Sequence, residues 1–219
     1  MNNNIAIDGP AGAGKSTVAK AVAKKLGLIY VDTGAMYRAL GLYLIRNKID
    51  VNDEKTVISA LDDADVTIEY ENGEQIVLLN GENVNGVIRT QEVSEMASAC
   101  SAIAEVRKSM VKRQQKLARE KDVVMDGRDI CEVVLPDART KIFLTASTSV
   151  RAKRRYDELV AKGVECNFDE IEADIIKRDD RDMNRAASPL RKTEDATLVD
   201  TSDMTVDEVI ERIVGLAND

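Results

Sequence analysis

Glycines, a lysine and two hydroxyl residues cluster near the start of the chain. Residues 9–17 are Gly9, Pro10, Ala11, Gly12, Ala13, Gly14, Lys15, Ser16 and Thr17. Up to Ser16 they fit the spacing G-x-x-x-x-G-K-[ST]. Glycines let backbone N–H groups turn inward around a polyphosphate, where side chains would block the approach. In this pattern the lysine charge lies beside the β- and γ-phosphates and the serine hydroxyl is offered to Mg²⁺.

The residues on either side of this stretch match the strand and the helix that a phosphate-binding P-loop requires. Ile5-Ala6-Ile7 is a short apolar run, typical of a buried strand. After the loop, apolar residues recur at helical spacing, and Gly27 is a plausible helix stop. Because both flanks are present, we favour a P-loop over a chance glycine-rich turn.

An aspartate follows a second strand-like run, Val123-Val124-Met125. Asp126 occupies the position of a Walker-B carboxylate, which holds Mg²⁺ directly or through water. An aspartate that caps a turn would give the same pattern, and the residues alone leave both interpretations open.

Arg178, Arg181, Asp182 and Arg185 share one face of a predicted helix, about 100° wide at 100° per residue. Like charges on one face repel unless an anion or carboxylates neutralise them. One interpretation is a solvated face in which Arg178 pairs with Asp174 and Asp182. We favour the other, in which the arginines meet a developing phosphoryl charge.

The helix before it carries Arg151, Arg154 and Arg155, which add positive charge. We interpret residues 148–190 as a mobile helical lid that closes over a nucleotide.

Strand-like and helical segments alternate along the chain. Besides the two runs above, the predicted core strands are residues 28–31, 141–144 and 197–199. Asp32-Thr33-Gly34 is expected as a turn before a helix from Ala35 to Ile45, and a later helix is expected from Phe168 to Asn184. This alternation predicts an α/β fold of the P-loop NTPase type, a five-stranded parallel sheet with helices on both faces. Ligands of such sheets bind at the carboxyl ends of the strands.

One region departs from this alternation. Val66 to Tyr70 alternates, Asn72-Gly73 is typical of a hairpin turn, and Gln75 to Leu79 supplies a partner strand. We interpret residues 65–90 as a small antiparallel insert; a long decorated loop is the alternative. Residues 1–219 then form one domain, with a core of about 1–62, 91–147 and 191–219.

The composition narrows the classes of function. The 219 residues carry a net charge of −8, which argues against a general nucleic-acid binder. There is no histidine, which excludes Ser-His-Asp and Cys-His catalysis and histidine-ligated zinc. No apolar run reaches the ~18 residues of a membrane span. We expect a cytoplasmic monomer with reduced cysteines.

Several motifs together resemble bacterial cytidylate (CMP) kinases, a family of P-loop nucleoside monophosphate kinases. They are Gly9–Ser16, Asp32-Thr33-Gly34-Ala35-Met36-Tyr37-Arg38, Asp126-Gly127-Arg128-Asp129-Ile130, Arg178-Asp179-Asp180-Arg181-Asp182 and Ser188-Pro189-Leu190. The resemblance runs from residue 5 to about 215, and the antiparallel insert also matches.

The resemblance implies transfer of the ATP γ-phosphoryl group to CMP or dCMP, with Mg²⁺. By this likeness residues 9–17 hold ATP, while Ser16 and Asp126 hold Mg²⁺. The residues that grip the acceptor phosphate are Arg38, Arg128 and Arg185. Those that read cytosine are Ser98, Arg107 and Asp129, with Thr33 and Tyr37 lining the same pocket. Arg178 and Asp182 contact the pentose, and the catalytic set is Lys15, Arg128, Arg181 and Arg185.

The chemistry of cytosine agrees with these roles. Cytosine has a donor at N4 and acceptors at N3 and O2, so a carboxylate and an arginine are its complement. Uracil has an acceptor at position 4 and a donor at N3, the reverse of cytosine. We therefore expect Asp129 and Arg107 to select against UMP. The reaction needs no histidine as a general base. A phosphate monoester with a second pKa of ~6 is already largely dianionic at pH 7, so the attacking oxygen needs little deprotonation.

At one place the chain departs from the family pattern. Cys131-Glu132 stands where a Gly-Thr pair is usual, and a Glu132 that points inward would weaken monophosphate binding. Two other functions are compatible with the P-loop: a kinase for UMP or a metabolite hydroxyl, and a nucleotide-dependent switch without a second substrate.

Overall fold

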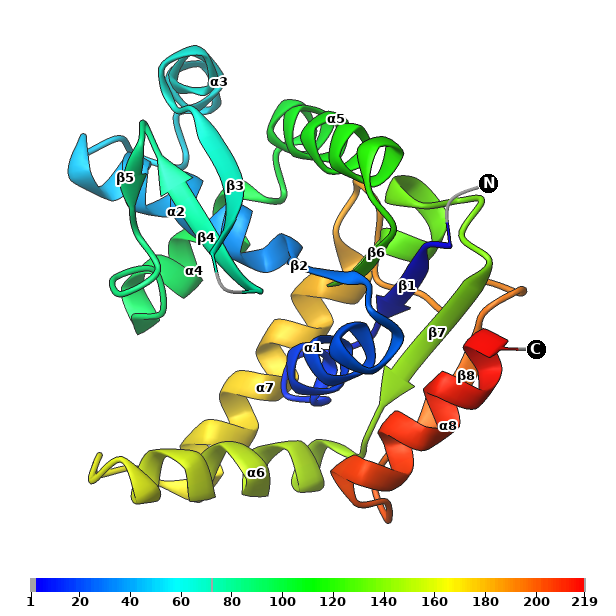
Figure 1. The fold of residues 1–219 in the computed structure, drawn as a ribbon. Helices are drawn as coiled ribbons and strands as arrows, with labels where there is room; N and C mark the ends of the chain where they lie inside the picture. Colours follow the sequence, from blue (N-terminus) through cyan, green and yellow to red (C-terminus); the bar gives the residue numbers. More distant parts are fainter. Residues whose placement is uncertain (1–2, 72, 219) are drawn as a thin grey trace.

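The large sheet places the P-loop at its centre. The computed structural model describes residues 3–71 and 73–218. Its parallel strands are β1 (Ile5–Asp8), β2 (Ile29–Asp32), β6 (Val123–Gly127), β7 (Thr140–Thr145) and β8 (Thr197–Asp200), in the order β2-β6-β1-β7-β8 (Figure 1). The predicted five-stranded parallel sheet is confirmed. Because β1 is central, the loop that follows it opens between β6 and β7, where this class of sheet binds ligands.

Helices cover both faces of this sheet. Alternate strand residues point to opposite faces. Ile5 and Ile7 pack with α1 (Lys15–Leu26) and α8 (Val206–Asn218), whereas Ala6 packs on the other face with Ala118 of α5 (Ala104–Glu120). Gly27 ends α1 in the left-handed conformation, as predicted.

A second, antiparallel sheet contains β3 (Val66–Glu71), β4 (Glu74–Leu79) and β5 (Glu82–Asn83). It shares one hydrophobic cluster with α2 (Thr33–Arg46), α3 (Glu54–Asp63), α4 (Gln91–Cys100) and part of α5. The antiparallel pair was predicted, but β5 was not, because two residues are too short to show an alternating pattern. Asn72 of the predicted turn lies outside the described residues, and Gly73 has a φ of 79°.

One local prediction needs correction, and one segment was not predicted. Asp32-Thr33-Gly34 is not a turn: α2 begins at Thr33, and the Asp32 side chain caps it by accepting from the Ala35 N–H. Ile130–Val134 forms a short π-helical segment that the sequence did not indicate. Its first N–H groups bond to a distant carboxylate, that of Asp8, at 2.9 Å from Ile130 and 2.8 Å from Cys131.

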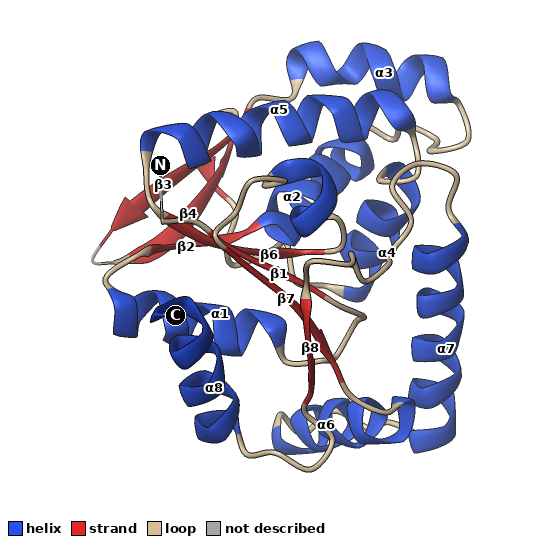
Figure 2. Cartoon of the chain, turned by 90° about the vertical axis from the view of Figure 1, so that its right-hand side faces the viewer, coloured by secondary structure: helices blue, strands red, loops and turns tan. Residues whose placement is uncertain are grey.

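Residues 148–190 contain α6 (Thr148–Ala161) and α7 (Phe168–Asn184), which pack together. In Figure 2, α7 runs from α6 up to α4, and Arg181 of α7 bonds to Ser98 of α4. Closure of these helices, and the division into core, insert and lid, stay predictions. Over the described ranges, no helix is both long and apolar enough to cross a membrane.

Candidate active site

The P-loop has the backbone geometry that its glycines predict. Gly12 and Gly14 lie in the left-handed region at φ 75° and 85°, and Gly9 has a φ of 151°. A Cβ on Gly9 would lie 1.9 Å from the carbonyl oxygen of Leu144, so only glycine fits there. The helix α1 begins at Lys15, within the last part of the loop, and its first N–H groups are available to an anion.

Lys15 is buried, with 6% of its surface exposed, and its ammonium donates to the Pro10 carbonyl at 2.7 Å. Burial, helped by the nearby charge of Arg128, lowers the pKa of Lys15 to about 7. A bound polyphosphate would restore the charged form.

Asp126 lies beside Ser16 at the carboxyl end of β6. Its carboxylate accepts from the Ser16 hydroxyl at 3.0 Å and from the Tyr30 hydroxyl at 2.9 Å. Both donors come from other elements, so Asp126 is not the turn-capping residue of the alternative interpretation. Burial, with a smaller contribution from Asp32, raises the pKa of Asp126 to about 6.

These oxygen atoms fit Mg²⁺. Mg²⁺ is usually bound by one or two carboxylates together with substrate phosphates and water. Within residues 3–71 and 73–218, no group of three or more acidic, cysteine or histidine side chains could hold a metal. Ser16 and Asp126 offer two oxygen atoms of this kind, and phosphate and water would supply the remaining ligands.

On the other side of the P-loop, charged residues from several elements converge. Arg128 donates to Asp182 at 2.7 Å, which joins β6 to α7. Arg181 donates to Ser98 at 3.0 Å, which joins α7 to α4. The side chains predicted to bind the acceptor are thus held together by contacts between distant segments.

Arg107 and Asp129 form a buried ion pair, with 5% and 6% of their surfaces exposed. The guanidinium of Arg107 also lies 5.7 Å from the centre of the Tyr37 ring, where cation–π attraction is favourable. The pair places a carboxylate and a guanidinium side by side, as recognition of cytosine would require.

Several donors around this site are buried without a hydrogen-bond partner among the described residues. They are the Tyr37 hydroxyl, Nε of Arg38, Arg107 and Arg178, and Nη2 of Arg185. Buried polar groups are rarely left unpaired, because the loss costs roughly 1–3 kcal/mol each. Their gathering in one place indicates an anionic ligand.

Arg178 does not behave as part of a solvated face. Burial, together with the nearby Arg128, lowers its pKa to about 10, and Asp182 bonds to Arg128. Burial alone would raise the pKa of the Asp182 carboxyl. The charge and the hydrogen bond of Arg128, helped by other nearby arginines, outweigh burial and hold this pKa below its usual value. Arg181 is more exposed than Arg178.

The arginines of α6, predicted only to add positive charge, bond to groups of the protein itself. Arg151 is buried and donates to the Ala11 carbonyl at 2.9 Å and to Asp179 at 2.6 Å. Arg154 donates to Thr201, and Arg155 pairs with Glu158 on the surface. Arg151 therefore joins α6 to the P-loop and α7, and Arg154 joins it to the chain after β8, whereas Arg155 pairs within its own helix.

The unusual pair Cys131-Glu132 does not face the acceptor site. Cys131 is 1% exposed and packs in the core beneath the sheet. Glu132 pairs with the exposed Arg191, which lowers the pKa of Glu132. An inward Glu132 is thus not observed.

Sequence reasoning missed two residues at the site. Asp8 bonds to the backbone that follows Asp129, and Asp32 contacts Arg38 at 2.9 Å. Asp8 adjoins Gly9 and Asp32 lies in a recognised motif, but a single sequence does not show which backbone or arginine each one reaches.

The P-loop and the parallel sheet define this chain as a P-loop kinase in architecture. A crystal structure of shikimate kinase from Bacteroides thetaiotaomicron has a similar fold, with a TM-score of 0.50 at 16% identity, covering 100% of this chain and 99% of that one. The family model for cytidylate kinase matches residues 5–219.

Close relatives agree with the family model. A cytidylate kinase from Caldicellulosiruptor saccharolyticus is 51% identical over 213 residues, 97% of this chain and 94% of the relative. One from Caldanaerobacter subterraneus is 51% identical over 209 residues, 95% of this chain and 92% of the relative. The chain belongs to the cytidylate kinase family.

Proposed function

We propose that this chain transfers the γ-phosphoryl group of MgATP to CMP or dCMP at the carboxyl edge of the large sheet. Family membership gives the reaction class, a phosphotransferase that acts on CMP with ATP as phosphate donor. It does not favour the alternatives, a kinase for another acceptor or a nucleotide-dependent switch.

One observation supports the acceptor site above all: the buried guanidinium and hydroxyl donors that have no hydrogen-bond partner in the described part of the chain. Several cations in one pocket repel each other, and the free energy of that arrangement improves when a dianion enters. A nucleoside monophosphate supplies that charge together with a base and a sugar.

On the donor side, residues 9–17 would wrap the ATP phosphates, with Lys15 beside the β- and γ-phosphates. Ser16 and Asp126 are the residues that would hold Mg²⁺. Bound there, Mg²⁺ would neutralise charge on the phosphate oxygens. Because burial lowers the pKa of Lys15 to about 7, bound phosphate would favour its charged form, and that charge would then stabilise the phosphate.

On the acceptor side, Arg38, Arg128 and Arg185 would grip the phosphate of CMP. Asp129 would accept from cytosine N4 while Arg107 donates to N3 and O2, with Ser98 at the same edge. Thr33 and Tyr37 would line the base pocket. Arg178 and Asp182 would contact the pentose, and Arg181 would join Lys15, Arg128 and Arg185 around the transferred phosphoryl group.

Catalysis here needs no general base. The second pKa of a phosphate monoester is near ~6, so the attacking oxygen carries charge at pH 7. The rate enhancement then comes from in-line positioning and from neutralisation of the equatorial oxygens by lysine and arginine.

The test is ADP release from MgATP with CMP, dCMP, UMP, AMP or GMP, beside a control without acceptor. We expect CMP and dCMP to exceed the other nucleotides by orders of magnitude. Equal, slow hydrolysis in every reaction would contradict the proposal. A preference for UMP would contradict the roles of Asp129 and Arg107.

A further inference from the structure

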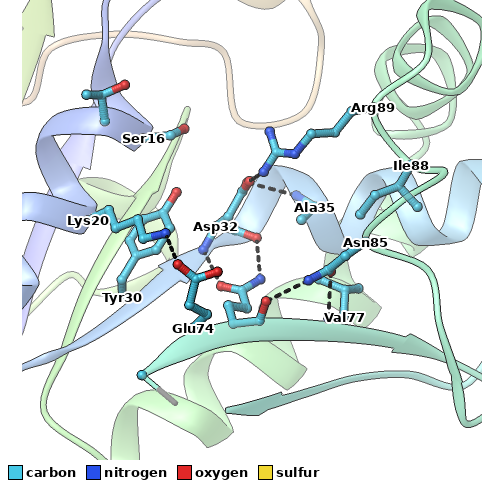
Figure 3. A pocket seen from close by; sticks show the side chains of 13 residues that line it. Ser16, Lys20, Tyr30, Asp32, Ala35, Glu74, Val77, Asn85, Ile88 and Arg89 are labelled. Carbon is cyan, nitrogen blue, oxygen red and sulfur yellow. Dashed lines mark hydrogen bonds and ion pairs between the residues drawn. The ribbon is translucent and has the colours of Figure 1, made fainter. Parts of the chain in front are cut away.

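Asp32 ends β2 and is 5% exposed. One carboxylate oxygen accepts from the Ala35 N–H at 2.9 Å and caps α2. The other accepts from two guanidinium groups, Arg38 at 2.9 Å and Arg89 at 3.0 Å. Figure 3 shows the carboxylate between Arg89 and Ala35. A helix cap needs only the first of these bonds, so the second oxygen has a separate use.

The small sheet holds the backbone of Asp32 in place. The N–H of Asp32 donates to the Gln75 side chain at 2.8 Å, and the Asn85 side chain donates to the Gln75 carbonyl at 2.8 Å. These residues line a cavity of about 370 Å³ between α1, β2 and β4. The side chain of Asp32 is therefore held by its bond to α2, and its backbone is held by Gln75 of β4.

We propose that Asp32 is a positioning residue that orients Arg38 toward the acceptor phosphate. The inference rests on the proposed function, which assigns that phosphate to Arg38. A guanidinium is planar, so a bond to one terminal nitrogen limits the orientation of the whole group. The bond to Asp32 uses Nη2 of Arg38, while its Nε is buried without a partner among the described residues. That arrangement leaves Nε for the ligand.

Arg89 supplies a second positive charge beside Asp32. A carboxylate paired with Arg38 alone would cancel the charge that a phosphate dianion needs. Arg89 shares the same oxygen, so the three groups together keep a net charge of +1. The Arg89 side chain is 67% exposed and that of Arg38 is 17% exposed, so Arg38 is the buried member of the pair.

Asp32→Asn separates capping from positioning. Asparagine caps helices as well as aspartate does, but its amide would present N–H donors to two guanidinium groups. A hydrogen bond to a charged group contributes about 1.5–3 kcal/mol, so we expect the KM for CMP to rise roughly 10- to 100-fold. The KM for ATP should stay within about twofold. Asp53→Asn is the matched control, because Asp53 caps α3 and has no arginine partner among its described contacts.

Arg38→Ala and the double variant complete the cycle. If Asp32 acts through Arg38, adding Asp32→Asn to Arg38→Ala should raise the KM for CMP no further. Full additivity, or a normal KM for CMP in Asp32→Asn while Arg38→Ala is impaired, would overturn the inference. A normal KM for CMP in Arg38→Ala would instead overturn the phosphate role of Arg38 in the proposed function. If Asp32→Asn does not fold, Asp32→Ser keeps a capping oxygen and is read in the same way.

Discussion

The two sides of the site are built in different ways. The donor side is one contiguous loop, residues 9–17, whose shape depends on positive φ angles at glycines and on a lysine bonded to its own loop. The acceptor side is assembled from α2, α4, α5, the end of β6, and α7. Its contacts join Arg128 to Asp182 and Ser98 to Arg181, residues 54 and 83 positions apart.

The difference suggests how each side responds to change. The loop is fixed mainly by its own backbone, with Arg151 bonding to its Ala11 carbonyl from α6, so it should keep its shape when side chains of the acceptor side are altered. A pocket fixed by ion pairs between segments depends on every partner, since removing one member leaves a buried charge unpaired. Damage to one side should therefore leave ligand binding on the other side largely intact.

The largest effect is expected from Lys15→Ala. It removes the cation beside the transferred phosphoryl group, and loss of one such stabilising group lowers turnover on the order of 10²- to 10³-fold. The protein should still fold, because the hydrogen bond that the Lys15 side chain makes among the described residues is to Pro10, within the loop itself. Turnover is measured by ADP release and folding by the melting temperature. Near-normal turnover would remove the P-loop from the mechanism.

Asp129→Ala should damage the acceptor side alone. It removes the proposed contact to cytosine N4 and leaves the buried Arg107 without its carboxylate. We expect the KM for CMP to rise roughly 10- to 100-fold, from the ~1.5–3 kcal/mol of a charged hydrogen bond. The KM for ATP should change little. If ATP binding weakened and CMP binding did not, the assignment of the cytosine site would be wrong.

The pH dependence of ATP binding tests the donor side. The pKa of free Lys15 is lowered to about 7, so the ammonium loses its proton as the pH rises above 7. Bound phosphates favour the ammonium form of Lys15. Above pH 7, binding of MgATP must therefore be accompanied by uptake of a proton from solution. Affinity for MgATP should fall between pH 7.5 and 9, approaching 10-fold per unit. Asp126, with a pKa of about 6, is ionised throughout this range. Calorimetry that gives a flat profile would contradict the prediction, and the slope should disappear in Lys15→Ala.

The smallest effect on activity is expected at Glu132. Glu132→Thr restores a residue usual in the family but breaks only a partly exposed ion pair with Arg191, worth about 0–1 kcal/mol. The KM for CMP should change less than about twofold. Cys131→Gly should instead lower stability by about 1–3 kcal/mol, because it empties a buried position and frees the backbone. A large gain in CMP affinity from Glu132→Thr would show that Glu132 reaches the acceptor.

Sequence patterns predicted what depends on neighbours in the chain. The P-loop, the Gly27 stop, the parallel strands and the α7 boundaries all follow from local spacing and composition. The predicted start of α2, at Ala35, was two residues too late, because an Asp-Thr-Gly run fits a turn and a capped helix equally well.

Partners across the fold could not be predicted. The π-helical segment after Asp129 depends on Asp8, more than 100 residues away. The disfavoured interpretation paired Asp182 with Arg178 of its own helix, and the structure pairs it with Arg128 of another segment. Arg151 was predicted only to add positive charge, and its bonds to Ala11 and Asp179 could not be read from the sequence. Each depends on how elements pack, which a single sequence does not encode by spacing.

Separate binding titrations of the two ligands would test the independence of the two sides most directly. The dissociation constants of MgATP and of CMP are measured by calorimetry for the unaltered chain, Lys15→Ala and Asp129→Ala. We predict that Lys15→Ala weakens MgATP and leaves CMP within about twofold, and that Asp129→Ala does the reverse. If either variant weakened both ligands alike, the two sides would not be independently built and this account would be contradicted.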